Sequence, residues 1–263
     1  MRIVLGLEYD GTAYAGWQRQ PVSASVITVQ EIVELAVSSI ANHPVSIVCC
    51  GRTDAGVHAT QQIVHFDTLI TRTIYAWVRG LNALLPKNVS VRWASWVDIS
   101  FHARYSALER RYTYVLYNNT VRPTLLHNRV GWVHRPLLLD PMQHAAQLLI
   151  GQHDFSSFRA SQCQAQSPIR TLTHCSIEQR GHLFLVHVQA NAFLHHMIRN
   201  IVGSLVYVGI GKWSVADFFT AFFAKDRCQG APTFSPDGLY FCGAIYPQYF
   251  NIPQPAMLEF LMV

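Results

Sequence analysis

Apolar and polar positions alternate along residues 2–9 with the period of two that is typical of a β-strand. Residues 89–97 alternate in the same way, and the apolar runs at 45–50 and 61–66 also predict strands. The first half of the chain is therefore expected to contain four strands.

Two helices are predicted between these strands. Thr28 opens a capping box with Glu31, and apolar residues at helical spacing follow as far as Ile40. A second helix is expected to begin after Thr73 and to end before Pro86. The resulting order, β-α-β-β-α-β, is that of a ferredoxin-like unit. We assign it to an N-terminal domain of residues 1–104.

The second half repeats this order of elements once one extra helix is set aside. The predicted elements are a strand at 110–117, a helix capped by Asp140, a polar irregular loop at 151–166, a hairpin at 171–178 and 183–190, a helix at 195–207, the extra helix after Ser214, and a strand at 239–246. We expect an α+β protein of two ferredoxin-like (βαββαβ) halves, residues 1–104 and 105–250. Their mostly antiparallel sheets should meet at a central active-site cleft, and residues 251–263 should form a tail.

Composition fits a globular protein. Of the 263 residues, 50% are hydrophobic and 13% charged, with a net charge of +5 and a pI of about 9.0. Apart from Lys87, Lys212 and Lys225, the basic residues are arginines, which suit phosphate and base contacts. The longest apolar stretch, residues 201–210, is too short to span a bilayer, and the N-terminus lacks a signal-peptide pattern. We therefore expect a cytoplasmic protein without a membrane segment.

Cysteine and histidine spacing gives no sign of a metal centre. None of the six cysteines forms a C-x-x-C pair, and the thirteen histidines show no zinc-ligand spacing. We expect reduced thiols, no bound metal and no cofactor.

The segment with the most distinctive chemistry is residues 49–59, between two predicted strands. Gly51 and Gly56 flank a single carboxylate, Asp54, so the backbone can turn tightly there and approach a ligand. Arg52 could orient that carboxylate or hold a phosphate. The alternative is an ordinary turn in which the Asp54 side chain accepts an Asx-type hydrogen bond from a backbone N–H.

Residues 51–59, Gly-Arg-Thr-Asp-Ala-Gly-Val-His-Ala, resemble the active-site motif of the tRNA pseudouridine synthase A family. That resemblance implies that Asp54 is the catalytic nucleophile and that Arg52 and Arg199 assist it. Arg199 lies in a segment similar to the family's F-L-x-x-M-V-R-N helix, whose arginine pairs with the catalytic carboxylate. Tyr112 matches the family's R-R-Y-x-Y strand, whose tyrosine contacts the target base.

The loop at residues 9–20 resembles the family's Y-D-G-T-x-Y-x-G-W-Q segment. The resemblance implies that Trp17 and Gln18 from this loop, and His58 from the motif, bind substrate. The alternative for Trp17 is a side chain that packs inward. Alone, Tyr112 could equally be a core aromatic residue and Arg199 a surface residue of a helix.

The resemblance further implies isomerisation of uridine to pseudouridine at nucleotides 38, 39 and 40 of the tRNA anticodon stem-loop. It also implies a homodimer with tRNA as partner. Whether Asp54 adds covalently to substrate or assists glycosidic cleavage is left open. One rival is an inactive RNA-binding module of the same fold. Another is a phospho-aspartyl transferase that uses Asp10, although Glu8 stands where its nucleophile belongs.

Overall fold

The computed structural model describes residues 1–21 and 26–254, and they form two compact units. Of the described residues, those up to 110 and residues 240–254 form unit 1, and residues 111–239 form unit 2. Residues 240–250, which the sequence analysis placed in the second half, thus group with unit 1. Residues 255–263 of the predicted tail lie outside the described residues, whereas Ile252 is buried and the Pro253 carbonyl accepts a hydrogen bond from Gln61.

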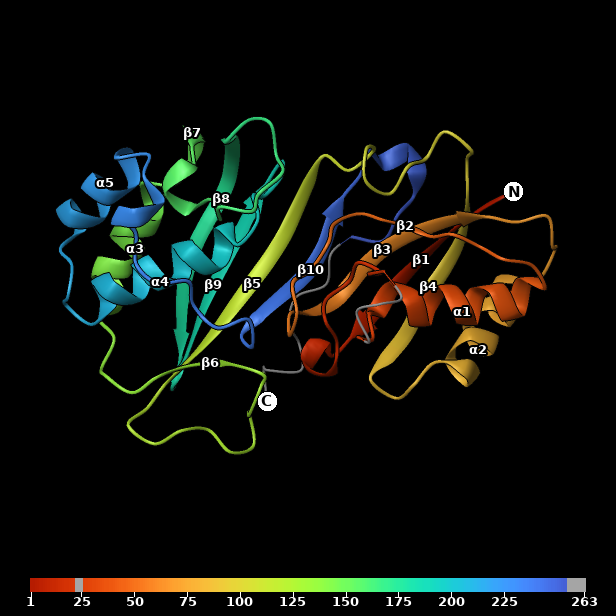
Figure 1. Cartoon of the computed structure of the whole chain (residues 1–263), viewed down its shortest axis with the longest axis horizontal. Helices are drawn as coiled ribbons and strands as arrows, with labels where there is room; N and C mark the ends of the chain where they lie inside the picture. Colours follow the sequence, from red (N-terminus) through yellow and green to blue (C-terminus); the bar gives the residue numbers. More distant parts are fainter. Residues whose placement is uncertain (22–25, 255–263) are drawn as a thin grey trace. The chain divides into compact units, whose positions relative to one another are not determined.

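The strands of unit 1 follow the order β4-β1-β3-β10, with β2 paired to β3 (Figure 1). β1 is antiparallel to both β3 and β4, and β10 is parallel to β3. Helices α1 and α2 contact each other, and α2 packs along β4. The elements are β1 (Arg2–Tyr9), α1 (Val29–Ala41), β2 (Val48–Cys49), β3 (His58–Asp67), α2 (Ile74–Leu84), β4 (Val89–Val97) and β10 (Leu239–Ile245).

The two helices of unit 1 begin where the sequence predicts. Thr28 is the N-cap of α1 and accepts a hydrogen bond from the Glu31 N–H, while Thr73 caps α2 through the Ala76 N–H. Each hydroxyl satisfies a backbone N–H that has no partner inside its helix. The strand predicted at 45–50 is shorter than expected: β2 covers only Val48–Cys49, although the Cys50 N–H also donates to the Ile63 carbonyl of β3 at 2.8 Å.

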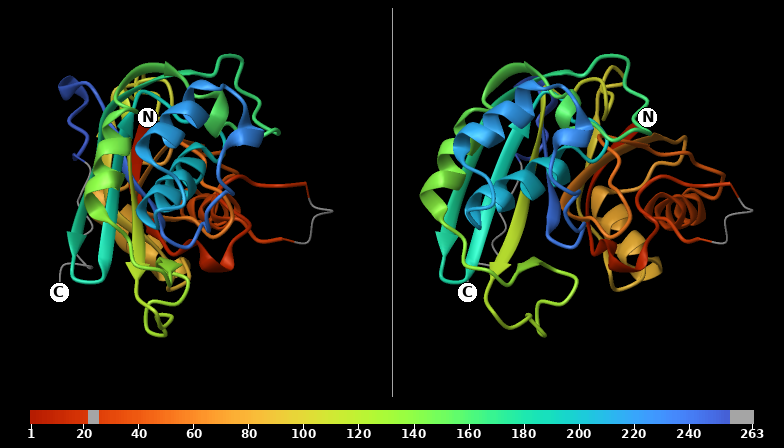
Figure 2. Two further views of the ribbon diagram at one scale, coloured as in Figure 1. Left: turned by 90° about the vertical axis from the view of Figure 1, so that its left-hand side faces the viewer. Right: turned by 60° about the vertical axis from the view of Figure 1, so that its left-hand side comes forward.

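The strands of unit 2 follow the order β5-β9-β8-β7, with β6 parallel to β5. Helix α3 packs on β8, and α3, α4 and α5 contact one another on one face of these strands (Figure 2). The elements are β5 (Glu109–Asn118), β6 (Gly131–Val133), α3 (Leu139–Gln147), β7 (Gly151–Asp154), β8 (Ile169–Arg180), β9 (Leu183–Ala190), α4 (Met197–Gly209) and α5 (Val215–Phe223).

Two sequence predictions in unit 2 are wrong. Asp140 does not cap α3: the N-cap is Leu138, without a side-chain hydrogen bond, and Asp140 lies in the first turn. There its charge still favours the positive end of the helix dipole. The segment 151–166 is not wholly irregular, since its first four residues form β7, antiparallel to β8. The extra helix predicted after Ser214 is confirmed, and it begins with a capping box in which Asp217 is the reciprocal partner of Ser214.

Together the elements make an α+β fold whose strand pairs are mostly antiparallel. No helix among the described residues has the length and apolar character needed to cross a bilayer. The six cysteines are all free thiols, as their spacing predicts.

Candidate active site

Asp54 lies in the loop between β2 and β3 and is half-buried. The Val57 N–H donates to the Asp54 carbonyl at 3.1 Å, which closes a tight turn. Gly56 completes this turn with φ +78, a left-handed conformation that favours glycine. The glycine that the sequence analysis singled out is therefore required by the backbone that carries the carboxylate.

A second loop, which follows β1, packs so closely against this turn that the two backbones are hydrogen-bonded. The Trp17 N–H donates to the Thr53 carbonyl at 3.0 Å. Gly16, at φ +92, leaves no room for a side chain: a Cβ there would lie 2.7 Å from Thr53 O and 3.1 Å from Ala55 N. A Cβ on Gly11 would lie 2.0 Å from Val57 O. Because neither glycine has a side chain, the loop after β1 can approach the turn this closely and restrain it.

Two buried side chains of the sheet also reach the turn. The hydroxyl oxygens of Tyr9 and Thr53 are 2.8 Å apart, and the Gln62 amide donates to the Gly51 carbonyl at 2.7 Å. Burial raises the pKa of Tyr9 well above its ordinary value, so this hydroxyl stays protonated. These contacts are not predictable from the sequence, because alternation along a strand says only that Tyr9 faces the core.

The other site residues predicted in unit 1, the catalytic Arg52 and the substrate-binding Trp17, Gln18 and His58, differ in exposure. Gln18 and Arg52 are exposed, whereas Trp17 is 1% and His58 is 2% exposed. In this structure Trp17 packs inward, as the alternative interpretation holds, and neither its indole nor the imidazole of His58 presents a face to solvent.

His58 instead supports the start of the loop after β1. Its Nδ1 lies 3.1 Å from both Gly11 N and Asp10 Oδ1. One ring nitrogen cannot accept from one group while it donates to another. We assign it as the acceptor from Gly11, because Asp10 Oδ1 already accepts from the Thr12 N–H and hydroxyl. Asp10 is thus the cap of a short 3₁₀ turn, Gly11–Ala13.

In unit 2, Tyr112 lies on β5 and is 9% exposed. Its ring and that of Phe193 meet edge to face, with ring centroids 5.0 Å apart and planes inclined by 77°. Arg199 lies in the first turn of α4 and is half-buried. Its Nε donates to the Phe234 carbonyl at 2.8 Å, which fixes the plane of the guanidinium group.

Asn200, the next residue of α4, gathers three other segments. Its side-chain amide donates to Phe158 O at 2.8 Å and accepts from Thr233 Oγ1 at 2.7 Å and from Arg227 Nη2 at 3.1 Å. A buried amide that uses its donor and acceptor sides holds its neighbours in one arrangement. The start of α4 is therefore a rigid mount for Arg199.

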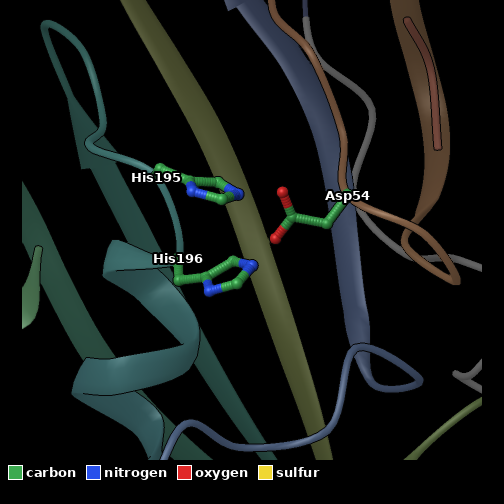
Figure 3. Close-up of side chains that lie close together, drawn as sticks. All are labelled: Asp54, His195 and His196. Carbon is green, nitrogen blue, oxygen red and sulfur yellow. The ribbon is translucent and has the colours of Figure 1, made fainter. Parts of the chain in front are cut away.

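The residue before α4, His196, adopts a left-handed conformation at φ +59. This is uncommon for a residue with a side chain, and such conformations gather at functional sites. The imidazoles of His195 and His196 lie side by side with ring centroids 3.9 Å apart (Figure 3). The His195 N–H contacts Cys163 Sγ at 3.4 Å.

Comparison with known proteins identifies the chain's relatives. The family model described as tRNA pseudouridine synthase matches residues 7–106 and 145–247. The chain is 51% identical to "tRNA pseudouridine synthase A" of Dechloromonas aromatica over 97% of this chain and 96% of that protein. It is 49% identical to the protein of the same name from Shewanella denitrificans over the whole of both chains.

One solved structure, "Crystal Structure of a Cbf5-Nop10-Gar1 Complex", is similar with a TM-score of 0.37 and 12% identity, over 91% of this chain and 49% of that one. This likeness is too low to support an argument. The full-length sequence matches decide the assignment: the chain belongs to the tRNA pseudouridine synthase A family, a family of isomerases.

Proposed function

We propose that this chain converts uridine to pseudouridine at nucleotides 38, 39 and 40 of the tRNA anticodon stem-loop, with Asp54 as the catalytic residue. Membership of the family supports the reaction. The observation that supports the residue is the turn at 51–57, where glycines and buried hydrogen bonds hold a single half-buried carboxylate in place.

The reaction needs little from the protein beyond acid-base and nucleophilic chemistry. The N1–C1′ bond of uridine breaks, a C5–C1′ bond forms, C5 loses its proton and N1 gains one, so substrate and product have the same atoms. Two roles for the Asp54 carboxylate fit this sequence: covalent addition to the substrate, or assistance to glycosidic cleavage. No electron acceptor is required by either.

Arg199 and Tyr112 are proposed to serve the same reaction. The guanidinium of Arg199 would keep Asp54 ionised and correctly aimed, as the family resemblance implies. Tyr112 would stack on the target base, and its hydroxyl could accept the C5 proton. Gln18 would contact the RNA, and Arg52, also exposed, would orient Asp54 or hold a phosphate of the RNA. A base inside a folded stem-loop must leave its stack to react, at a cost of a few kcal/mol.

We further propose that the chain folds as two ferredoxin-like halves with a central cleft that holds the target base. We also propose that it forms a homodimer that binds tRNA in the cytoplasm. The basic composition, with a net charge of +5, supports an RNA partner.

The decisive experiment treats an unmodified tRNA transcript, prefolded, with the purified protein and maps pseudouridine at each uridine. We expect product only at nucleotides 38–40, with no turnover of free uridine or UMP. Efficient isomerisation of the free nucleotide would instead indicate an enzyme for small molecules. Binding of tRNA without any pseudouridine would favour the inactive RNA-binding module.

A further inference from the structure

Three buried polar side chains of unit 1 converge on the residues just before Asp54. Tyr9 Oη lies 2.8 Å from Thr53 Oγ1, and Gln62 Nε2 lies 2.7 Å from the Gly51 carbonyl and 3.5 Å from Tyr9 Oη. Tyr9 is 3% exposed and Gln62 is fully buried. These side chains are too deep to touch a substrate, so any effect on the reaction must pass through the turn.

The three bonds restrain the turn at separate points. Thr53 is held twice, at its hydroxyl by Tyr9 and at its carbonyl by the Trp17 N–H, while Gly51 is held by Gln62. Tyr9 and Gln62 themselves lie on paired strands, since Gln62 of β3 is opposite Leu7 of β1. Asp54 is therefore attached directly to a residue whose position is set by the sheet.

Gln62 lowers the stability of the fold in one respect, so its presence is not explained by packing alone. Its Oε1 is buried and has no hydrogen-bond partner among the described residues. A buried polar atom without a partner destabilises a fold, and an apolar side chain of similar size would avoid this loss. Both donor contacts of the amide point toward the turn and the tyrosine that holds it.

We propose that Tyr9, Thr53 and Gln62 are positioning residues that set the angle at which the Asp54 carboxylate meets the target uridine. This inference rests on the proposed function, in which Asp54 is the catalytic residue. The three residues act through the backbone of the turn and not through contact with RNA.

The test measures kcat and KM for prefolded tRNA with Tyr9→Phe, Thr53→Val and Gln62→Met. Misplacement of a reacting group by about 1 Å can lower a rate on the order of a hundredfold, and smaller displacements lower it less. We therefore expect kcat to fall about tenfold or more in each variant, with KM changed less than about twofold. Thr53→Ser, which keeps the hydroxyl, should retain most of the activity.

The Tyr9→Phe/Thr53→Val double variant adds a second readout. Because the two hydroxyls form one bond, we expect the double variant to be no slower than the worse single variant. If Tyr9→Phe fails to fold, the contrast between Thr53→Ser and Thr53→Val still decides the question. Wild-type kcat in Thr53→Val and Gln62→Met would overturn the inference.

A matched control is available in the same unit. Tyr14 Oη donates to Asn88 Oδ1 at 2.7 Å, so Tyr14→Phe removes a comparable bond that does not involve the turn. This variant should keep the wild-type kcat; an equal loss there would also overturn the inference. Asp54→Asn separates the two proposals: if it stays active, the proposed catalyst is wrong, and if it is inactive while Thr53→Val is normal, only the positioning role fails.

Discussion

Arg199 and Phe234 are joined by two hydrogen bonds in opposite directions. Arg199 Nε donates to the Phe234 carbonyl at 2.8 Å, and the Phe234 N–H donates to the Arg199 carbonyl at 3.2 Å. The guanidinium therefore has a structural contact through Nε in addition to its positive charge. Substitutions at this position can separate the two contributions.

We expect turnover to fall in the order wild type, Arg199→Lys, Arg199→Gln, Arg199→Ala. Lysine keeps the charge but has a carbon where Nε was, whereas glutamine places an amide nitrogen near Nε and has no charge. A loosened carboxylate can cost on the order of a hundredfold in rate, which is our expectation for lysine. Tritium release from C5-labelled tRNA under single-turnover conditions measures the effect.

The order of lysine and glutamine is informative. If Arg199→Gln turns over faster than Arg199→Lys, the hydrogen bond to Phe234 matters more than the charge. That result would contradict the proposal that Arg199 keeps Asp54 ionised and correctly aimed. Circular dichroism and thermal melting of each variant establish that the comparison is made on folded protein.

Asp54→Asn should reduce pseudouridine formation to background while tRNA affinity changes little. Asparagine preserves the size of the side chain but removes its nucleophilic and basic oxygen. Asp10→Asn is the matched control, because its Oδ1 can still accept from Thr12. We expect this control to be active. Retention of pseudouridine formation in Asp54→Asn would contradict Asp54 as the catalytic residue.

Gly16→Ala should lower both stability and turnover. The new Cβ would lie 2.7 Å from the Thr53 carbonyl at a φ of +92, so the loop must move away from the turn. Gly181→Ala is the control: its φ is +57, yet nothing lies within 4 Å of the added Cβ. The free energy of unfolding of each variant should fall by about 1 kcal/mol or more, because alanine is strained in the left-handed conformation. Urea unfolding measures this loss. Only Gly16→Ala should also have a lower kcat. Equal kcat values in the two variants would contradict the idea that contact with the loop after β1 positions the turn.

Stability should fall as pH decreases from about 6.5 to about 4, partly because of His65. Burial, with the charges of Arg2 and His102, lowers the pKa of His65 to about 4. In this range the unfolded chain binds a proton that the folded chain excludes, so unfolding becomes easier as pH falls. His65→Asn retains an acceptor for the Ala103 N–H but does not titrate. Its melting temperature should depend less on pH; an unchanged pH dependence would contradict this account.

Full activity is expected in EDTA without added cofactor. The adjacent imidazoles of His195 and His196 are potential ligands of a transition metal, which makes the test worth performing. Mg²⁺ also folds tRNA, so the RNA should be folded beforehand and assayed in monovalent salt. Strict dependence on a transition metal under these conditions would contradict the cofactor-free reaction.

The sequence alone predicts much of the local structure. The caps at Thr28, Thr73 and Ser214 and the hairpin of β8 and β9 can be identified because their signals lie within a few residues of one another. The motif at 51–59 likewise marks Asp54 through flanking glycines. Where a local signal was ambiguous, as at Asp140, the helix began two residues earlier than predicted.

Only the tertiary structure shows what holds Asp54. Tyr9 and Thr53 are 44 residues apart, and their contact depends on the register of β1 against β3. Likewise β10 pairs with β3 across a long sequence separation. A periodic pattern says which face of a strand is buried but not which distant side chain it meets there. That choice is made by packing and hydrogen bonding over the whole unit, because a buried hydroxyl or amide must find its partner wherever the fold brings one.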